Sequence, residues 1–331
     1  MMSNRRIVVV GCGSIGRRHA RLLSDRKDLS LEICERSPEH LTRALEEVGN
    51  VPTHTSFKEM LETKPEMVVI ATPHSLHAQQ SIESLRAGCH VLCEKPMSHN
   101  LAEAKQMVSA VENSDRVFSV GFTFHFHPVM LKIRDMIKNG VLGQLLYLHF
   151  HIGTYLTLMN SVSRHQAEVE GAIAMDYAHQ PDLYCWWLDK LPTSVYAVGM
   201  KGGELPLQSN PNVMAIILEY DKSPIATLHL NYVQHPDRGY CEVVGEKGWV
   251  FFDSKSSTLR IGMHEGNLET TEEYSIGRDS LYVTEHQAFL DAIAGKRTPE
   301  SPAQEAIRSM QIVEATLQSW KRNARINLSV D

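Results

Sequence analysis

A glycine-rich turn between an apolar strand and a helix is the feature that most constrains the fold of this chain. The turn reads Gly11-Cys12-Gly13-Ser14-Ile15-Gly16. In residues 6–10 before it, Arg6 is followed by four β-branched residues, which is typical of a strand buried on both faces. Residues 17–23 after it have the apolar seam of a helix. G-x-G-x-x-G alone is a weak signal, but between a strand and a helix it predicts a dinucleotide-binding turn.

The three glycines of this turn are expected to serve different purposes. Gly11 permits a tight turn, Gly13 lets a pyrophosphate approach the backbone, and Gly16 lets the helix lie against the strand. The pyrophosphate then meets the N-terminus of the helix, where free N–H groups and the helix dipole favour an anion. A flavodoxin-like turn that binds no dinucleotide is the alternative interpretation.

An acidic residue follows the second predicted strand, where the fingerprint requires one about 20 positions further on. This residue is Glu35, after the strand-like residues 31–34. Its carboxylate is placed to accept hydrogen bonds from the ribose hydroxyls and to repel a 2′-phosphate, which favours NAD. Arg36 and Ser37 come next and offer a cation and a hydroxyl to such a phosphate, so NADP stays possible.

Strands and helices alternate as far as Gly121 and then the pattern changes. Further buried strands are expected at residues 67–71, 90–93 and 117–120, joined by right-handed parallel crossovers. Extended runs with short turns then follow between residues 144 and 261, and two helices end the chain. We predict an α/β chain with an N-terminal Rossmann domain, residues 1–122, and a C-terminal α+β domain, residues 123–331, that contains a large, mostly antiparallel open sheet.

The stretch His90-Val91-Leu92-Cys93-Glu94-Lys95-Pro96 brings a lysine to the end of a buried strand. In open parallel sheets, ligands bind outside the carboxyl ends of the strands. A lysine held there by a rigid strand is a better candidate for chemistry than one on a helix face, although an isolated lysine is usually only a solvated surface residue.

Composition excludes several classes of partner. The formal net charge is −6 and no long basic run occurs, so no nucleic acid partner is expected. No apolar run approaches the ~20 residues that cross a bilayer, and no export signal is visible, so no membrane association is expected. The 6 cysteines have no C-x-x-C spacing, which indicates neither a zinc site nor a disulfide framework. A reducing cytoplasm is the predicted location.

Further motifs accompany the glycine turn. They are A-T-P-H-S-L-H at residues 71–77, A-G-C-H-V-L-C-E-K-P at 87–96, G-V-L-G at 140–143, D-Y-A-H at 176–179 with Asp182, and a closing helix at 301–322. In these motifs the chain resembles the glucose–fructose oxidoreductase / inositol dehydrogenase family (Gfo/Idh/MocA) along nearly its whole length. The second domain resembles the family mainly in the order of its elements.

The resemblance implies an NAD(P)-dependent oxidoreductase acting on CH–OH groups of a small polyhydroxylated substrate, namely a sugar, sugar derivative or cyclitol. It also implies a homodimer or homotetramer, with the second domain binding the substrate and mediating oligomerisation. The residues that it implies for cofactor binding are Gly11, Gly13, Ser14, Ile15, Gly16, Glu35, Arg36, Ala71, Thr72, Pro73, His74, His77, Glu94, Lys95, Pro96 and Thr123.

In such enzymes the lysine of E-K-P, an aspartate and a following histidine surround the reacting carbinol. By motif these are Lys95, Asp176 and His179. Many members have D-x-x-x-H, whereas His179 comes three positions after Asp176. The run D-Y-A-H-Q-P-D resembles a D-x-S-H-E-x-D variant with Ala for Ser and Gln for Glu, so the departure bears on the aspartate more than on the histidine.

Each of the three residues has an expected role. His179, with an ordinary pKa near ~6.5, accepts the hydroxyl proton. Asp176, three positions earlier, is expected to share a helix face with it and either to orient the ring or to stabilise its cationic form. Lys95 hydrogen-bonds the substrate oxygen and favours the developing alkoxide. The alternative is that Asp176 is an acid at a helix N-terminus and His179 a packed histidine.

Further substrate contacts are expected outside this trio. His125 stands in T-F-H-F-H-P where the family often has N-x-R-F, so it either replaces a substrate-binding arginine or only packs. Tyr155, Asn160 and Arg164 lie in a long polar loop suited to a polyhydroxylated ligand. His149 and His151 alternate on a strand without ligand spacing, so no metal is predicted.

Two other functions remain open for this scaffold. One is an NAD-dependent glycoside hydrolase that oxidises a sugar transiently, cleaves its glycosidic bond and reduces it again. The other is a non-catalytic regulator that senses a nucleotide or a sugar. The presence of Lys95, Asp176 and His179 together counts against the regulator.

Overall fold

The computed structural model describes residues 5–155, 169–203 and 209–328. The chain divides into two compact units. The first comprises Met1–Phe126 and Gly277–Met310, and the second comprises His127–Ile276 and Gln311–Asp331. Each unit is built on a sheet of its own, so the two are described separately.

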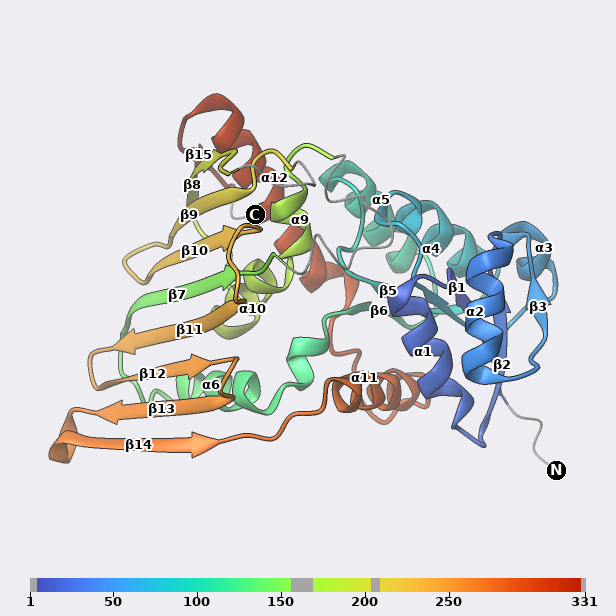
Figure 1. Ribbon diagram of the computed structural model, residues 1–331, viewed down its shortest axis with the longest axis horizontal. Helices are drawn as coiled ribbons and strands as arrows, with labels where there is room; N and C mark the ends of the chain where they lie inside the picture. The colour runs from blue at the N-terminus through green and yellow to red at the C-terminus, as the bar shows by residue number, and fades with distance from the viewer. Residues whose placement is uncertain (1–4, 156–168, 204–208, 329–331) are drawn as a thin grey trace. The chain divides into compact units, whose positions relative to one another are not determined.

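A six-stranded parallel sheet forms the centre of the first unit (Figure 1). Its strand order is β3-β2-β1-β4-β5-β6, and all neighbours run parallel. The order changes direction between β1 and β4, which is where open α/β sheets bind ligands. The predicted Rossmann architecture is therefore confirmed. The strands are β1 (Arg5–Val10), β2 (Leu29–Cys34), β3 (Thr53–His54), β4 (Met67–Ile70), β5 (His90–Glu94) and β6 (Phe118–Gly121).

Helices connect these strands, and polar side chains mark where several of them begin. In α5, Asn100 Oδ1 accepts a hydrogen bond from the Glu103 backbone N–H, and Asn100 Nδ2 donates to Glu103 Oε1. This exchange satisfies groups that the first turn of a helix leaves unpaired. The elements are α1 (Ser14–Ser24), α2 (Pro38–Val48), α3 (Phe57–Glu62), α4 (His77–Arg86), α5 (Leu101–Glu112), and the 3-10 turns η1 (His74–Leu76) and η2 (Thr123–Phe126).

The parallel sheet is buried on both faces. Consecutive residues of β1 alternate between two hydrophobic clusters, with Ile7 and Val9 in one and Val8 and Val10 in the other. This alternation is the period-2 pattern of a strand covered by helices on both sides. It explains why the strands read as continuous apolar runs in the sequence.

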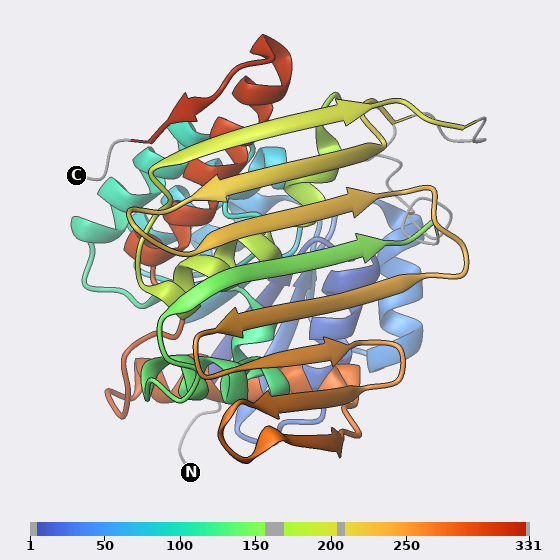
Figure 2. The same ribbon diagram turned by 90° about the vertical axis from the view of Figure 1, so that its left-hand side faces the viewer.

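The second unit contains a nine-stranded sheet, seen face-on in Figure 2. Its order is β14-β13-β12-β11-β7-β10-β9-β8-β15. Of the described strand pairs in this sheet, only β7–β10 is parallel. The prediction of a large, mostly antiparallel sheet is confirmed. The strands are β7 (Leu145–Gly153), β8 (Ser194–Met200), β9 (Val213–Glu219), β10 (Ile225–Asn231), β11 (Arg238–Gly245), β12 (Gly248–Asp253), β13 (Thr258–Met263), β14 (Leu268–Glu273) and β15 (Ile326–Asn327).

Aromatic side chains fill the core of this unit. Phe150 of β7 packs against Tyr184 and Trp187, with ring centroids 5.3 and 5.5 Å away. Trp186 and Trp187 are 6% and 2% exposed, as expected of core residues. The remaining elements are α6 (Pro128–Lys138), α9 (Ala172–Asp176), α10 (His179–Leu188) and η3 (Glu265–Asn267).

The compact units differ from the predicted division into residues 1–122 and 123–331. Helix α11 (Arg278–Ile293) and the start of α12 (Ala303–Arg322) belong to the first unit. The reason is packing, because Phe289 and Leu290 complete the hydrophobic cluster that contains Ile7 and Val9. None of the described helices is long and apolar enough to cross a membrane.

Candidate functional site

Three turns of the first unit lie at the same edge of its sheet. The glycine turn follows β1, the T-P-H turn follows β4, and the E-K-P stretch ends β5. These strands are parallel neighbours in the order β1-β4-β5, so their carboxyl ends are adjacent. The sequence motifs that are 60 to 80 residues apart, as from Gly11 to Ala71 and Gly16 to Lys95, thus meet at one place.

The backbone of the glycine turn accepts only glycine at two positions. Gly11 has a φ of +87°, and a Cβ there would lie 2.8 Å from Thr72 Cγ2. A Cβ on Gly16 would collide with the carbonyl oxygen of Gly11. Helix α1 therefore begins in direct backbone contact with the turn, as the spacing of the glycines predicts.

The N-terminus of α1 is open to an anion. Gly13 is its N-cap residue, no side chain caps it, and its first turn has no acidic residue. A Cβ on Gly13 would meet no protein atom within 4 Å, and Ser14 beside it is exposed. Free N–H groups, a favourable dipole and adjacent open space fit the pyrophosphate of a dinucleotide.

Glu35 closes the site on the side of β2. Its side chain is 9% exposed, and its two carboxylate oxygens accept hydrogen bonds from the backbone N–H groups of Cys12 (2.6 Å) and Ser37 (2.7 Å). The carboxylate is thereby fixed against the glycine turn. Arg36 is exposed. A fixed negative charge beside the turn fits a ribose diol better than a 2′-phosphate.

The T-P-H turn is held by a buried histidine. The ring nitrogens of His77 lie 2.8 Å from the carbonyl oxygens of Pro96 and Thr72, so the ring joins this turn to the E-K-P stretch. Burial lowers the pKa of His77, against the opposing effect of these two carbonyls. His77 was predicted to bind the cofactor, but here both of its nitrogens face the protein backbone.

His74 is buried beside a residue that the sequence did not single out. Its Nδ1 lies 3.2 Å from His99 Nδ1, and the two rings stack with centroids 5.1 Å apart. Thr72 donates from its hydroxyl to Gln80 Oε1 at 2.6 Å. These contacts hold the side chains of His74 and Thr72. The backbone of the turn, with Ala71 and Pro73, lies at the carboxyl end of β4.

Glu94, the last residue of β5, and Lys95, which follows it, lie in different environments. Glu94 is buried, with His19 Nε2 at 2.9 Å from its Oε1 and the Lys95 backbone N–H donating to its Oε2 at 3.1 Å. The Lys95 side chain is half-buried. The buried carboxylate thus anchors the backbone from which the lysine side chain extends, while Pro96 ends the strand.

Thr123 and His125 lie in η2, after β6. Both are buried, and His125 Nδ1 lies 3.0 Å from Ser301 Oγ and 4.0 Å from Glu300 Oε1. Of the two roles considered for His125, packing describes what the structure shows. Its substrate-binding role stays a prediction.

In the second unit, Asp176 and His179 stand at two abutting helix ends. Helix α9 ends at Asp176 and α10 begins at His179. Tyr177, with φ −97° and ψ 32°, separates them, so the expectation of a shared helix face was wrong. Both side chains are half-buried.

A tyrosine that sequence reasoning missed supports Asp176. The hydroxyl of Tyr232 donates a hydrogen bond to Asp176 Oδ2, and its ring lies 5.8 Å from that of Tyr177. Tyr232 is fully buried, and burial together with the charge of Asp176 raises its pKa well above the usual value. Tyr232 therefore stays a hydrogen-bond donor. It is 56 residues away from Asp176 in sequence, and no motif links the two.

The remaining predicted substrate contacts are only partly described. The Tyr155 backbone N–H donates to the Gln234 carbonyl, and its ring lies 6.4 Å from that of His235. Asn160 and Arg164 lie outside the described residues. His149 and His151 hydrogen-bond Thr227 and Gln234, at 2.8 Å each.

Comparison with known sequences identifies both halves of the chain. A profile described as an oxidoreductase family, NAD-binding Rossmann fold, matches residues 5–122. A second profile, the C-terminal alpha/beta domain of the same oxidoreductase family (GFO_IDH_MocA), matches residues 134–328. Together the two profiles span most of the chain.

Individual relatives are similar over most of their length. The myo-inositol 2-dehydrogenase of Thermotoga maritima is 23% identical, with 98% of both chains covered. The 2,7-anhydro-N-acetylneuraminate hydratase of Escherichia coli is 26% identical, covering 88% of this chain and 80% of the relative. The crystal structure of an oxidoreductase from Agrobacterium radiobacter with NAD+, L-tartaric acid and magnesium has a TM-score of 0.88 at 18% identity, with 98% of both chains covered. This last likeness shows the fold.

Proposed function

Since the chain belongs to the Gfo/Idh/MocA family of NAD(P)-dependent oxidoreductases, we propose that it transfers a hydride between NAD and a carbinol of a sugar, sugar derivative or cyclitol. The observation that carries this proposal is the meeting of the glycine turn, the T-P-H turn and Lys95 at one edge of the parallel sheet. That edge offers an anion site and a cationic side chain, which are the parts that a dinucleotide and a reacting oxygen need.

In the proposed reaction, Lys95, His179 and Asp176 have different roles. The nicotinamide, when bound, accepts or supplies the hydride. Lys95 donates a hydrogen bond to the substrate oxygen and stabilises negative charge on it. His179 takes the hydroxyl proton during oxidation and returns it during reduction. Asp176, which accepts a hydrogen bond from Tyr232, favours the protonated form of the His179 imidazole.

We propose NAD in preference to NADP. The support is Glu35, whose carboxylate is fixed by the backbone N–H groups of Cys12 and Ser37. A fixed carboxylate repels a 2′-phosphate, and moving it would break both hydrogen bonds. Arg36 is exposed and stands beside this carboxylate in sequence, so any attraction of a phosphate to Arg36 competes with the repulsion from Glu35.

The substrate class follows the relatives. One similar protein is named a myo-inositol dehydrogenase, another a D-glucoside 3-dehydrogenase and a third a 1,5-anhydro-D-fructose reductase. All three names describe redox chemistry on polyhydroxylated rings. Tyr155 and Asp176 offer hydrogen-bonding groups of the kind that such rings require.

A second candidate function has a specific observation in its favour. The Escherichia coli relative is named a hydratase, which denotes a reaction without net oxidation. The same residues would then oxidise a sugar transiently, permit bond cleavage beside the new carbonyl, and reduce the product again. Such a reaction consumes no nucleotide.

The test is a panel of sugars, glycosides and cyclitols incubated with NAD and, separately, with NADP. Formation of reduced nucleotide with a subset of the panel, faster with NAD, is the expected result. Parallel product analysis detects cleavage or hydration without net reduction, which would favour the second candidate. Binding of panel members without either outcome would contradict both and favour a sensing regulator.

A further inference from the structure

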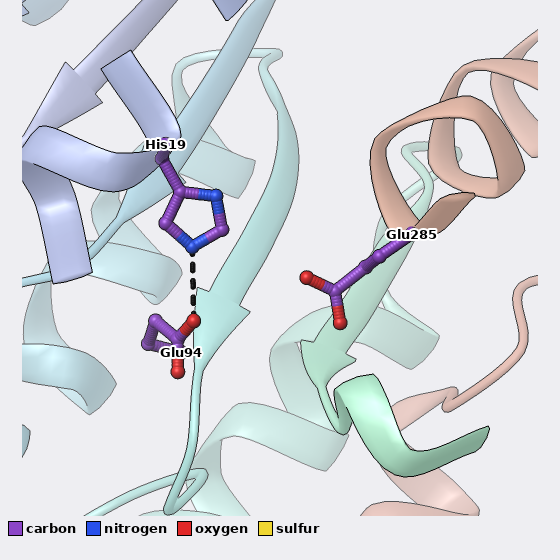
Figure 3. A group of neighbouring side chains, drawn as sticks. All are labelled: His19, Glu94 and Glu285. Atoms are coloured by element: carbon purple, nitrogen blue, oxygen red, sulfur yellow. Dashed lines mark hydrogen bonds and ion pairs between the residues drawn. The ribbon is translucent and has the colours of Figure 1, made fainter. Parts of the chain in front are cut away.

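A buried group of ionisable side chains lies in the first unit next to the E-K-P stretch. His19 of α1, Glu94 of β5 and Glu285 of α11 point toward one another (Figure 3). One nitrogen or oxygen atom from each lies within 4.8 Å of the others. Their exposed fractions are 0%, 7% and 3%. Three ionisable groups in so small a buried space require a definite distribution of protons.

Glu94 has the surroundings of an ionised carboxylate. His19 Nε2 lies 2.9 Å from its Oε1, and the Lys95 backbone N–H donates to its Oε2. Burial raises the pKa of Glu94, but the hydrogen bond and charge of His19 and the charge of Lys95 outweigh burial and hold this pKa below the usual value. The negative charge of the group therefore rests on Glu94.

Glu285 has the opposite surroundings. Neither of its carboxylate oxygens has a hydrogen-bond partner among the described residues. Burial, and then the charge of Glu94, raise its pKa well above the usual value. Two carboxylates in such proximity cannot both be ionised, and the one without donors keeps the proton.

We propose that Glu285 is a neutral carboxylic acid in the folded enzyme at neutral pH. Its neutrality leaves Glu94 free to keep its hydrogen bond to the Lys95 backbone. Glu285 is thereby a positioning residue for the lysine. The positioning role rests on the proposed function of Lys95, whereas the protonation state does not.

The protonation states of the other titratable groups around Glu285 are compatible with a neutral Glu285. His286, also on α11, lies 2.7 Å from His19 Nδ1 through its Nε2, and burial lowers its pKa well below the usual value, so it stays neutral. Burial, and then the charge of Glu94, raise the pKa of Tyr282, so its hydroxyl stays protonated. The Arg18 guanidinium lies over the Tyr282 ring, at 5.3 Å from its centroid. On η2, His125 faces Ser301.

A divalent metal ion is the competing way to neutralise this group. His19, Glu94 and Glu285 offer three ligand atoms, but His19 Nε2 and Glu94 Oε1 are already hydrogen-bonded to each other. A tetrahedral ion would have to replace that contact and find a fourth ligand. A proton requires neither change.

Infrared spectroscopy tests the protonation state directly. At neutral pH the wild-type spectrum minus that of E285Q should show the C=O stretch of one protonated carboxyl, because exposed carboxylates are ionised. The matched control is E305Q, which removes an exposed glutamate of α12 and should remove no such band. A difference spectrum with an ionised carboxylate band in place of the acid band would overturn the proposal.

The pH dependence of stability gives an independent test. The folded pKa of Glu285 is raised, so the wild type loses stability as pH rises from the unfolded pKa of about 4.3 toward the folded one. E285Q has no proton to lose. The folding equilibrium constant of the wild type relative to E285Q should therefore fall about tenfold per pH unit across this window. A ratio independent of pH would contradict a neutral Glu285.

The positioning role and the metal alternative have their own readouts. With a substrate found by the panel, kcat of the wild type should fall at alkaline pH as Glu285 ionises. The pH–rate profile of E285Q should lack this alkaline limb. Its affinity for NADH should stay within about threefold of that of the wild type. An unchanged alkaline limb in E285Q would overturn the positioning role alone.

Elemental analysis tests the metal alternative. One equivalent of zinc or manganese bound by the wild type and lost in E285Q would show a metal site and overturn the proposed proton.

Discussion

The two units hold their proposed site residues in different ways. In the first unit, the glycine turn, the T-P-H turn and Lys95 follow neighbouring parallel strands, and backbone contacts leave room only for glycine at Gly11 and Gly16. In the second unit, Asp176 and His179 stand at the ends of two helices, and the side chain of Tyr232 supports the aspartate. The first arrangement suits a cofactor that is the same in every turnover. The second can change by single substitutions, which suits a variable substrate.

The two units also hold their carboxylates differently. Glu94 is buried and hydrogen-bonded by His19 and by backbone, so its charge is permanent near neutral pH. Asp176 is half-buried beside a hydroxyl donor, and His179 near it in sequence is half-buried too. Access to solvent lets a histidine exchange protons during turnover. We therefore expect the permanent charge to come from the first unit and the group that exchanges a proton to come from the second.

Lys95→Ala gives the largest expected effect, and it tests the role proposed for the ammonium group beyond the end of β5. Loss of the ammonium group should lower kcat by about 10³-fold, as removal of one donor to a developing oxyanion does elsewhere. Binding of NADH, measured by fluorescence titration, should change little, because the anion site is on α1. Lys105→Ala, on the exposed side of α5, is the control. Turnover retained in K95A would remove Lys95 from the mechanism.

His179→Gln tests the mobile proton and should lower kcat by about 10²-fold. The pH–rate profile is the informative measurement. Loss of a general base should remove the acidic limb that a group of pKa near ~6.5 produces. If H179Q keeps both its rate and that limb, the proton passes through another group, and the division of roles between the two units fails.

Gly16→Ala and Gly13→Ala separate folding from binding within the first unit. A Cβ on Gly16 collides with the Gly11 carbonyl oxygen, so G16A should lose about 1–3 kcal/mol of unfolding free energy. G13A adds its methyl group to open space at φ −63°, so it should unfold like the wild type yet bind NADH more weakly. Urea unfolding and NADH titration of both variants measure this. Equal effects of the two substitutions on stability would contradict the assignment.

Tyr232→Phe gives the smallest expected effect, a fall in kcat of about tenfold, since it removes one hydrogen bond to a charged group. The ring and its packing against Tyr177 remain, so the melting temperature should change by only a few degrees. Tyr196→Phe on β8 is a matched control, because its hydroxyl contacts Asn323 at the surface. An equal change in both variants would show that support of Asp176 by Tyr232 is unimportant.

The sequence predicts the first unit well because its signals are local. Continuous β-branched and apolar runs such as Ile7–Val10 and Met67–Ile70 are typical of strands covered on both faces. Gly11 and Gly16 mark the turn, and each motif follows its strand directly. What was missed is nonlocal. Phe289 and Leu290 join this core after the segment His127–Ile276 of the other unit, and no pattern within α11 specifies which core it completes.

The second unit was predicted in outline only. Alternating runs identified most of its strands, but β14, with the sequence L-E-T-T-E-E, is an exposed edge strand without an apolar face. The break at Tyr177 was missed because the i, i+3 spacing of Asp176 and His179 fits one helix equally well. Tyr232 has no local signal, since only the folded sheet brings it to α9. Asn160 and Arg164 stay predictions.

The return of residues 277–310 to the first unit has a consequence for the order of events during synthesis. The ribosome makes the β1–β6 strands early, yet both hydrophobic clusters of their sheet lack members until α11 and the start of α12 emerge. Domains usually fold in turn as they leave the ribosome. Here the first unit cannot be completed until β7–β14 of the nine-stranded sheet have been translated. The nascent chain must therefore keep a partly covered apolar sheet in solution during that interval.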